Sequence, residues 1–150
     1  MCLYTSMKYA KEAEEDIICY KVVERSADLN AFLYYKSIWY DFIYKIGSRY
    51  HERSFCMCNT ESATLYEIRY GFHSYATLER LAFEFSKGWY PNNYVVLKCV
   101  IPKGTLYFVS NDIHTEYCSQ DIMVISELRC NIKYNKVIWD ECQDYKTLGE

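Results

Sequence analysis

The sequence predicts an α+β fold, in which a mostly antiparallel sheet of five to seven strands packs against one or two helices. Several short runs rich in β-branched and aromatic residues are typical of strands. One amphipathic stripe with start and stop signals is typical of a helix. The 150 residues contain only 5 Gly and 2 Pro and no linker or repeat, so a single domain over residues 1–150 is expected.

The first half of the chain alternates between strand signals and polar connections. Residues 16–24 are β-branched and aromatic and are bounded by charges, which predicts a strand. Residues 6–15 contain helix formers but fit an extended arm equally well. From 28 to 50 we expect a loop or helical turn, then a strand near 42–46 that ends at Gly47. Residues 51–64 are polar and are interpreted as a connection, and 65–70 predict a short strand.

The clearest helix signal lies between the two halves. Thr77 is the expected N-cap, and the following apolar stripe is formed by Leu78, Leu81, Ala82 and Phe85. The stripe ends at Lys87-Gly88, a common C-terminal signal. Residues 89–94, rich in aromatic rings and amides, either rim a pocket or pack as a surface loop.

The second half carries the strongest strand signal. Residues 94–101 form a continuous apolar, β-branched run that stops at the turn residues 102–104. Residues 105–109 continue as a strand, so the two would form a hairpin or a bent corner. Further strands are predicted at 121–125 and 135–139.

Charge and cysteine usage exclude several functional classes. Lys plus Arg is 17 and Asp plus Glu is 20, a net charge of −3, and no two basic residues are adjacent, which argues against generic nucleic-acid binding. The start lacks a signal peptide, and Cys19 and Cys99 lie in apolar runs, so the 8 cysteines are interpreted as reduced thiols of a cytoplasmic protein. No apolar run is long enough to span a bilayer, so no membrane partner is expected.

Six short motifs follow one another along most of the chain. They are Met1-Cys2-Leu3, Ala13-x-x-Asp16-Ile17-x-Cys19-Tyr20-Lys21, Tyr44-x-Ile46-Gly47, Gly71-Phe72-His73-Ser74, Leu97-Lys98-Cys99-Val100-Ile101-Pro102-Lys103-Gly104-Thr105-x-Tyr107 and Tyr117-x-Ser119-x-x-Ile122. The ordered set resembles a family of small uncharacterised proteins from gut bacteria and their phages. The resemblance implies one domain in a cytoplasmic setting, host cytoplasm if phage-encoded, and supplies no catalytic residues. By analogy with phage proteins that bind a host molecule, it suggests a counter-defence factor.

The segment 71–77 is the best candidate for a site. It joins a predicted strand to a helix start, where free N–H groups and the helix dipole favour an anion. His73 and Ser74 would add hydrogen bonds, and Tyr75 would stack on a ring. The alternative is that Ser74 and Thr77 only cap the helix while His73 orders the turn.

A second, weaker resemblance is to a degraded ADP-ribosyltransferase layout. It implies that Tyr20 or Lys21, Ser74, and Gln120 or Asp121 take the places that grip NAD. The first strand has no Arg or His and residues 117–121 contain no Glu, so the layout lacks its main electrostatic group. A nucleotide pocket without turnover is therefore favoured over a transferase.

Two cysteine patterns allow other chemistry. Cys56 and Cys58 form a close pair with His51 nearby, but no second close pair completes a zinc site, so no metal is predicted. Cys118 and His114 leave a nucleophile pair open, with no oxyanion signal beside it.

Together the residues favour a small soluble binding protein that captures an anionic, nucleotide-derived ligand, and the family resemblance implies a phage counter-defence factor. The alternatives are an ADP-ribosyltransferase-like enzyme and a protein–protein interaction module that inhibits a host protein. We predict no catalytic residue, cofactor or metal, and the sequence leaves a homo-oligomer open. The predicted ligand-binding residues are Tyr20, Lys21, Gly71, His73, Ser74, Tyr75 and Thr77.

Overall fold

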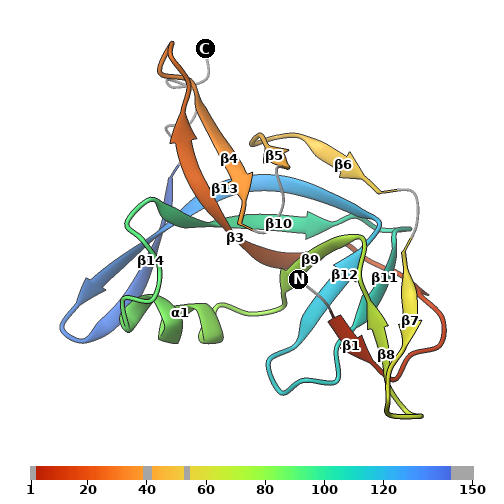
Figure 1. Ribbon diagram of the computed structural model, residues 1–150. Helices are drawn as coiled ribbons and strands as arrows, with labels where there is room; N and C mark the ends of the chain where they lie inside the picture. Colours follow the sequence, from red (N-terminus) through yellow and green to blue (C-terminus); the bar gives the residue numbers. More distant parts are fainter. Residues whose placement is uncertain (1–2, 39–41, 53–54, 143–150) are drawn as a thin grey trace.

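The computed structural model describes residues 3–38, 42–52 and 55–142 (Figure 1). Within these ranges the chain forms fourteen strands and one short helix, and all the pairings between strands are antiparallel. The mostly antiparallel sheet is confirmed, whereas the count of five to seven strands was wrong. Several of the additional strands have only two or three residues, too few to show a period of two in the sequence.

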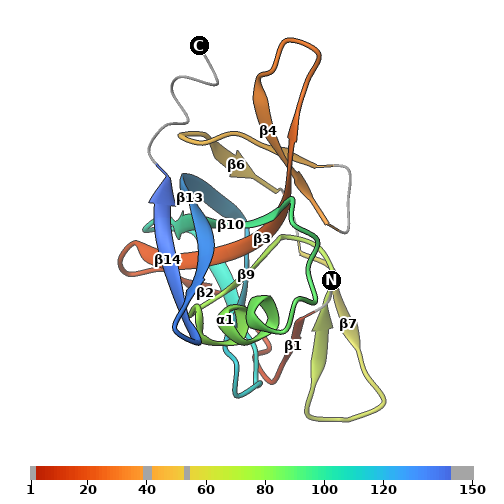
Figure 2. The ribbon, with the colours of Figure 1, turned by 90° about the vertical axis from the view of Figure 1, so that its left-hand side faces the viewer.

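Most strands belong to one large, branched sheet. Its main path, in spatial order, is β14 (Lys136–Cys142), β13 (Asp121–Lys133), β10 (Tyr94–Ile101), β3 (Ile17–Ala27), β9 (Phe72–Tyr75), β12 (Glu116–Ser119), β11 (Leu106–Val109) and β2 (Lys11–Glu12). The branches are β4 (Leu33–Ser37), which pairs with β3 and with β5 (Ile43–Tyr44), and β6 (Arg49–His51), which pairs with β13. The β3–β4 hairpin projects from the body of the sheet in both ribbon views (Figure 1, Figure 2).

A second, three-stranded sheet packs beside β11 and β12. Its order is β1 (Leu3–Thr5), β8 (Tyr66–Ile68) and β7 (Met57–Asn59). Leu3 and Ile68 of this sheet are buried in one cluster with Phe108 and Cys118 of the large sheet, and Phe55 packs against them. This apolar contact fixes the small sheet next to the start of β9.

The core is organised around β10, which pairs with β3 and with β13. Leu97 lies in the largest cluster, on one face, and Val96 lies on the other face with Leu81 and Leu128. Leu81 belongs to α1 (Glu79–Ser86), which lies below β3 and β10 in both views (Figure 1, Figure 2). No helix in the described ranges is long and apolar enough to span a bilayer.

The long strand signals were predicted well. Residues 94–101 coincide with β10, and the strand predicted at 16–24 is β3, which continues to Ala27. The strands at 121–125 and 135–139 correspond to β13 and β14, both longer than predicted. Between β10 and β11 a hairpin is excluded, because β10 pairs with β3 and β13 while β11 pairs with β12 and β2.

The other local predictions need correction. Leu78, not Thr77, is the N-cap, and no side-chain hydrogen bond caps the helix. The segment 51–64 is not only a connection, since it contains β7, and 28–50 contains β4. Of the two readings of 6–15, the structure has the extended one, because β2 lies there.

Gly71, just before β9, is required where the two sheets meet. Its φ is +109°, and an added Cβ would lie 2.7 Å from Cys118 Sγ and 3.0 Å from Phe55 Cε1. Gly88 has a φ of +68° with open space around it. A side chain at positive φ costs about 1 kcal/mol at either site, and overpacking adds about 1–3 kcal/mol at Gly71 alone.

We therefore expect Gly71→Ala to lower the free energy of unfolding by more than Gly88→Ala does. Urea denaturation followed by circular dichroism measures both variants. Equal losses in the two variants would contradict the close packing of Gly71 against Cys118 and Phe55.

Candidate functional site

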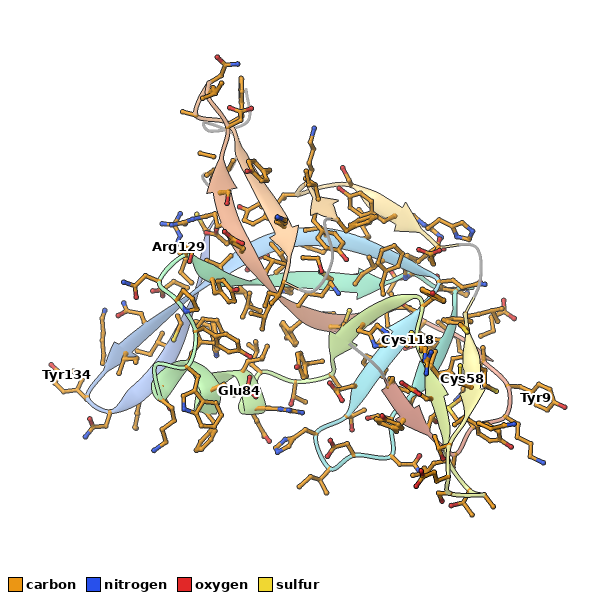
Figure 3. All side chains as sticks on the ribbon, in the orientation of Figure 1. Tyr9, Cys58, Glu84, Cys118, Arg129 and Tyr134 are labelled. Atoms are coloured by element: carbon orange, nitrogen blue, oxygen red, sulfur yellow. The ribbon has the colours of Figure 1, made fainter. Side chains whose placement is uncertain are left out.

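A cavity of about 610 Å³ lies between β3, β9 and α1. Its lining also includes Phe42 and Tyr44 around the start of β5, and Asp112 and Glu116 at the entry to β12. The volume is typical of sites for small ligands and cofactors. Figure 3 labels Glu84 on α1, which lines the cavity, and Cys118 on β12, which is not part of the described lining, well apart in that view.

One end of the cavity carries the ammonium group of Lys21, a half-buried residue. The Lys21 ammonium donates a hydrogen bond to the backbone carbonyl of His73 and lies 5.5 Å from the ring centroid of Tyr44. No carboxylate among the described residues forms an ion pair with it. Burial lowers the pKa of Lys21, because the charged form loses its hydration.

His73 and Cys118 lie side by side, with His73 Nε2 3.7 Å from Cys118 Sγ. Burial first, and then the charge of Lys21, lowers the pKa of His73 to about 3. Burial raises the pKa of the Cys118 thiol to about 12, and the thiol donates to the Tyr70 carbonyl at 3.0 Å. Both groups are therefore neutral near pH 7, unlike an activated thiolate–imidazolium pair. The pairing considered from sequence, with His114, is not formed, since His114 lies in an exposed loop.

The other end of the cavity holds an ordered ion pair on α1. The Glu84 carboxylate is buried and accepts hydrogen bonds from Arg80 Nε, at 3.0 Å, and from the Tyr90 hydroxyl. The Arg80 guanidinium lies 5.6 Å from the ring centroid of Tyr75. Arg80 is thus held by a carboxylate and a ring of the protein itself.

Glu116 stands opposite Tyr75 in the β9–β12 ladder. Its side chain lines the cavity and is half-buried, and among the described residues no hydrogen bond reaches its carboxylate. Burial raises the pKa of Glu116; Arg80 opposes this rise, and Asp112 and Glu84 add to it. The cavity therefore has the Lys21 ammonium at one end and, at the other, an acidic end at Glu116 that also contains Arg80; Glu52 and Arg69 are further charged residues of the lining.

Aromatic rings form much of the wall between these ends. The ring centroid of Phe42 lies 4.8 Å from that of Tyr44 and 5.7 Å from that of Phe72. Tyr75 and Tyr90 line the acidic end. Such ring faces accept a flat, apolar ligand group by stacking.

Four of the seven predicted ligand-binding residues line this cavity, namely Lys21, Gly71, His73 and Tyr75. The other three do not belong to the described lining. Tyr20 packs against the apolar cluster of α1, Ser74 is fully buried, and Thr77 is exposed.

The reason is that residues 72–75 form strand β9, in which successive side chains point to opposite faces. His73 and Tyr75 reach the cavity and Ser74 between them does not, although Phe72 at the start of the strand also belongs to the lining. This strand pairs with β12, and α1 begins only at Glu79. The segment therefore does not form the strand-to-helix loop that the helix-start interpretation required.

Sequence reasoning missed the charged residues at the acidic end. The sequence could have predicted the pairing of Arg80 with Glu84, because a spacing of four residues is typical of an ion pair on a helix. Glu116 had none, because its position depends on a ladder between distant strands. Residues 89–94 were predicted either to rim a pocket or to pack as a surface loop. Tyr90 of this segment lines the cavity, as the first interpretation expects.

The remaining sequence candidates lie elsewhere. Cys56 and Cys58 have their Sγ atoms 3.7 Å apart, but the described residues contain no group of three or more metal-ligating side chains. Asp121, considered for the transferase layout, is paired with Arg49 and His51 outside the cavity. Comparison with known protein families, curated proteins and solved structures finds no match.

The buried neutral His73 makes stability depend on pH. The pKa of His73 is depressed to about 3, while an unfolded histidine titrates near 6.5, so the unfolded state alone gains a proton between these values. The contribution of His73 is complete above about pH 6.5 and decreases as the pH falls toward 3, by at most about 1.4 kcal/mol per pH unit.

We expect His73→Gln to flatten the pH dependence of the unfolding free energy between pH 4 and 7. Urea titrations at several pH values measure it, with His114→Gln, in an exposed loop, as the matched control. An unchanged slope in His73→Gln would show that His73 is not held neutral.

Proposed function

We propose that this protein is a small binding protein that captures an anionic, nucleotide-derived ligand in the cavity between β3, β9 and α1. The observation that carries the proposal is the partly desolvated ammonium of Lys21, a half-buried residue with no carboxylate ion-pair partner among the described residues. A buried charge is costly unless it is paired. A phosphate group of a ligand would supply the missing counter-ion.

The shape and lining of the cavity support a ligand of this class. A volume of about 610 Å³ is ample for a nucleotide, and the rings of Phe42, Tyr44 and Phe72 offer stacking faces for a base close to Lys21. Tyr75 and Tyr90 offer further ring surface at the other end. The cavity thus combines an anion partner with flat apolar walls.

The same lining favours capture over turnover. The imidazole of His73 and the thiol of Cys118 are both held in their neutral, poorly reactive forms. The carboxylate of Glu84 is occupied by Arg80 and Tyr90. The motif resemblance extends the proposal to a phage counter-defence factor that acts in the host cytoplasm by sequestering its ligand.

Lys21→Met tests the role of the ammonium, because it keeps the length of the side chain and removes the charge. We expect this variant to bind at least about tenfold more weakly, in line with loss of a charge-assisted hydrogen bond. Its free energy of unfolding without ligand should not fall, since the substitution removes an unpaired buried charge. The control is Lys98→Met, at a half-buried lysine of β10 outside the described lining.

The binding measurements are thermal shift and calorimetry with ribonucleoside mono-, di- and triphosphates, cyclic dinucleotides and ADP-ribose. In parallel, protein exposed to cytosol is denatured and the released small molecules are identified by mass spectrometry. No shift with any probe, together with no released nucleotide, would overturn the proposal and turn attention to a protein partner.

A further inference from the structure

The acidic end of the cavity has a free acceptor. Glu84 is satisfied by Arg80 and Tyr90, whereas no hydrogen bond within the described residues reaches the carboxylate of Glu116. This carboxylate is half-buried and lines the cavity. A partly desolvated acceptor without a donor is unfavourable, so a ligand that brings donors would gain by meeting it.

The register of the sheet fixes where this acceptor lies relative to Lys21. The ammonium of Lys21 is bound to the carbonyl of His73, and Glu116 is the ladder partner of Tyr75. His73 and Tyr75 are two residues apart on β9. Because Lys21 and Glu116 line the same cavity, a ligand of nucleotide length that fills it can contact both charges.

The charges also set the orientation of such a ligand. Glu84 and Glu116 act on Arg80, and Asp112 adds a further negative charge near Glu116, so the acidic end repels a phosphate, while the Lys21 end attracts it. A ribose lies directly beside its 5′-phosphate, and its hydroxyl groups are hydrogen-bond donors that a carboxylate accepts well. The phosphate then lies at Lys21 and the sugar faces Tyr75 and Glu116.

We propose that Glu116 accepts hydrogen bonds from the ribose hydroxyl groups of the ligand, so that the site selects ribonucleotides over nucleotides without these hydroxyls. This inference rests on the proposed function and adds the sugar to it. A site built to bond a hydroxyl group rejects an analogue that lacks it, because its own polar group is left unpaired.

The test compares each ribonucleoside 5′-monophosphate with its 2′,3′-dideoxy counterpart by calorimetry. We expect the protein to bind the ribonucleotide at least about tenfold more tightly. Glu116→Met should weaken ribonucleotide binding and reduce the difference to less than about threefold. Glu116→Gln, which keeps one acceptor oxygen, should lie between the two, and Glu79→Gln, at an exposed position of α1, should match the unaltered protein.

The outcomes separate the two proposals. If the protein binds both nucleotides equally and Lys21→Met still abolishes binding, the role of Glu116 is wrong and the proposed function stands. If Glu116→Met keeps the full difference in affinity between the ribonucleotide and its dideoxy counterpart, another group recognises the ribose hydroxyls and the inference is overturned. If neither nucleotide binds, both proposals fail together.

Discussion

The antiparallel pairing of β10 with β3 on one side and β13 on the other is the constraint on which the rest of the structure depends. Eight consecutive residue pairs join β10 to residues Ile17–Glu24 of β3 and fix the register between the two strands. Val96 and Leu97, neighbours on β10, are fully buried on opposite faces. Because α1 packs on the Val96 face and β9 pairs with β3, this ladder positions both walls of the cavity.

An element of this fold could be predicted from the sequence only where the pattern of residues within the element itself was distinctive. Strand β10 is a continuous apolar run, and its limits were predicted to the residue, as expected for a strand buried on both faces. The strand predicted near 42–46 is β5, although only Ile43–Tyr44 form it. Strand β7 has three residues and exists because β8 offers it hydrogen bonds. No pattern within so short a segment distinguishes a strand from a loop, so β7 was not predicted.

The candidate site divides in the same way. Lys21 was singled out through the resemblance to an ADP-ribosyltransferase layout, and His73 for a helix-start geometry that the structure does not have. They meet because β3 and β9 are neighbours in the sheet. Glu116 was missed because its place opposite Tyr75 follows from the β9–β12 register. The sequence shows which residues are chemically capable, and the pairing of distant strands decides which of them share a cavity.

The charges of the cavity carry a cost in the protein without ligand. An ammonium and a carboxylate could neutralise each other, yet Lys21 and Glu116 are tied to different positions along β9, and Lys21 donates to a backbone carbonyl instead. Their separation leaves both partly unsatisfied, which a sequence optimised only for stability would avoid. A ligand carrying an anion and hydrogen-bond donors at matching distance would satisfy both ends in one binding event. The same separation would discriminate against simple anions such as inorganic phosphate, which can satisfy only the Lys21 end.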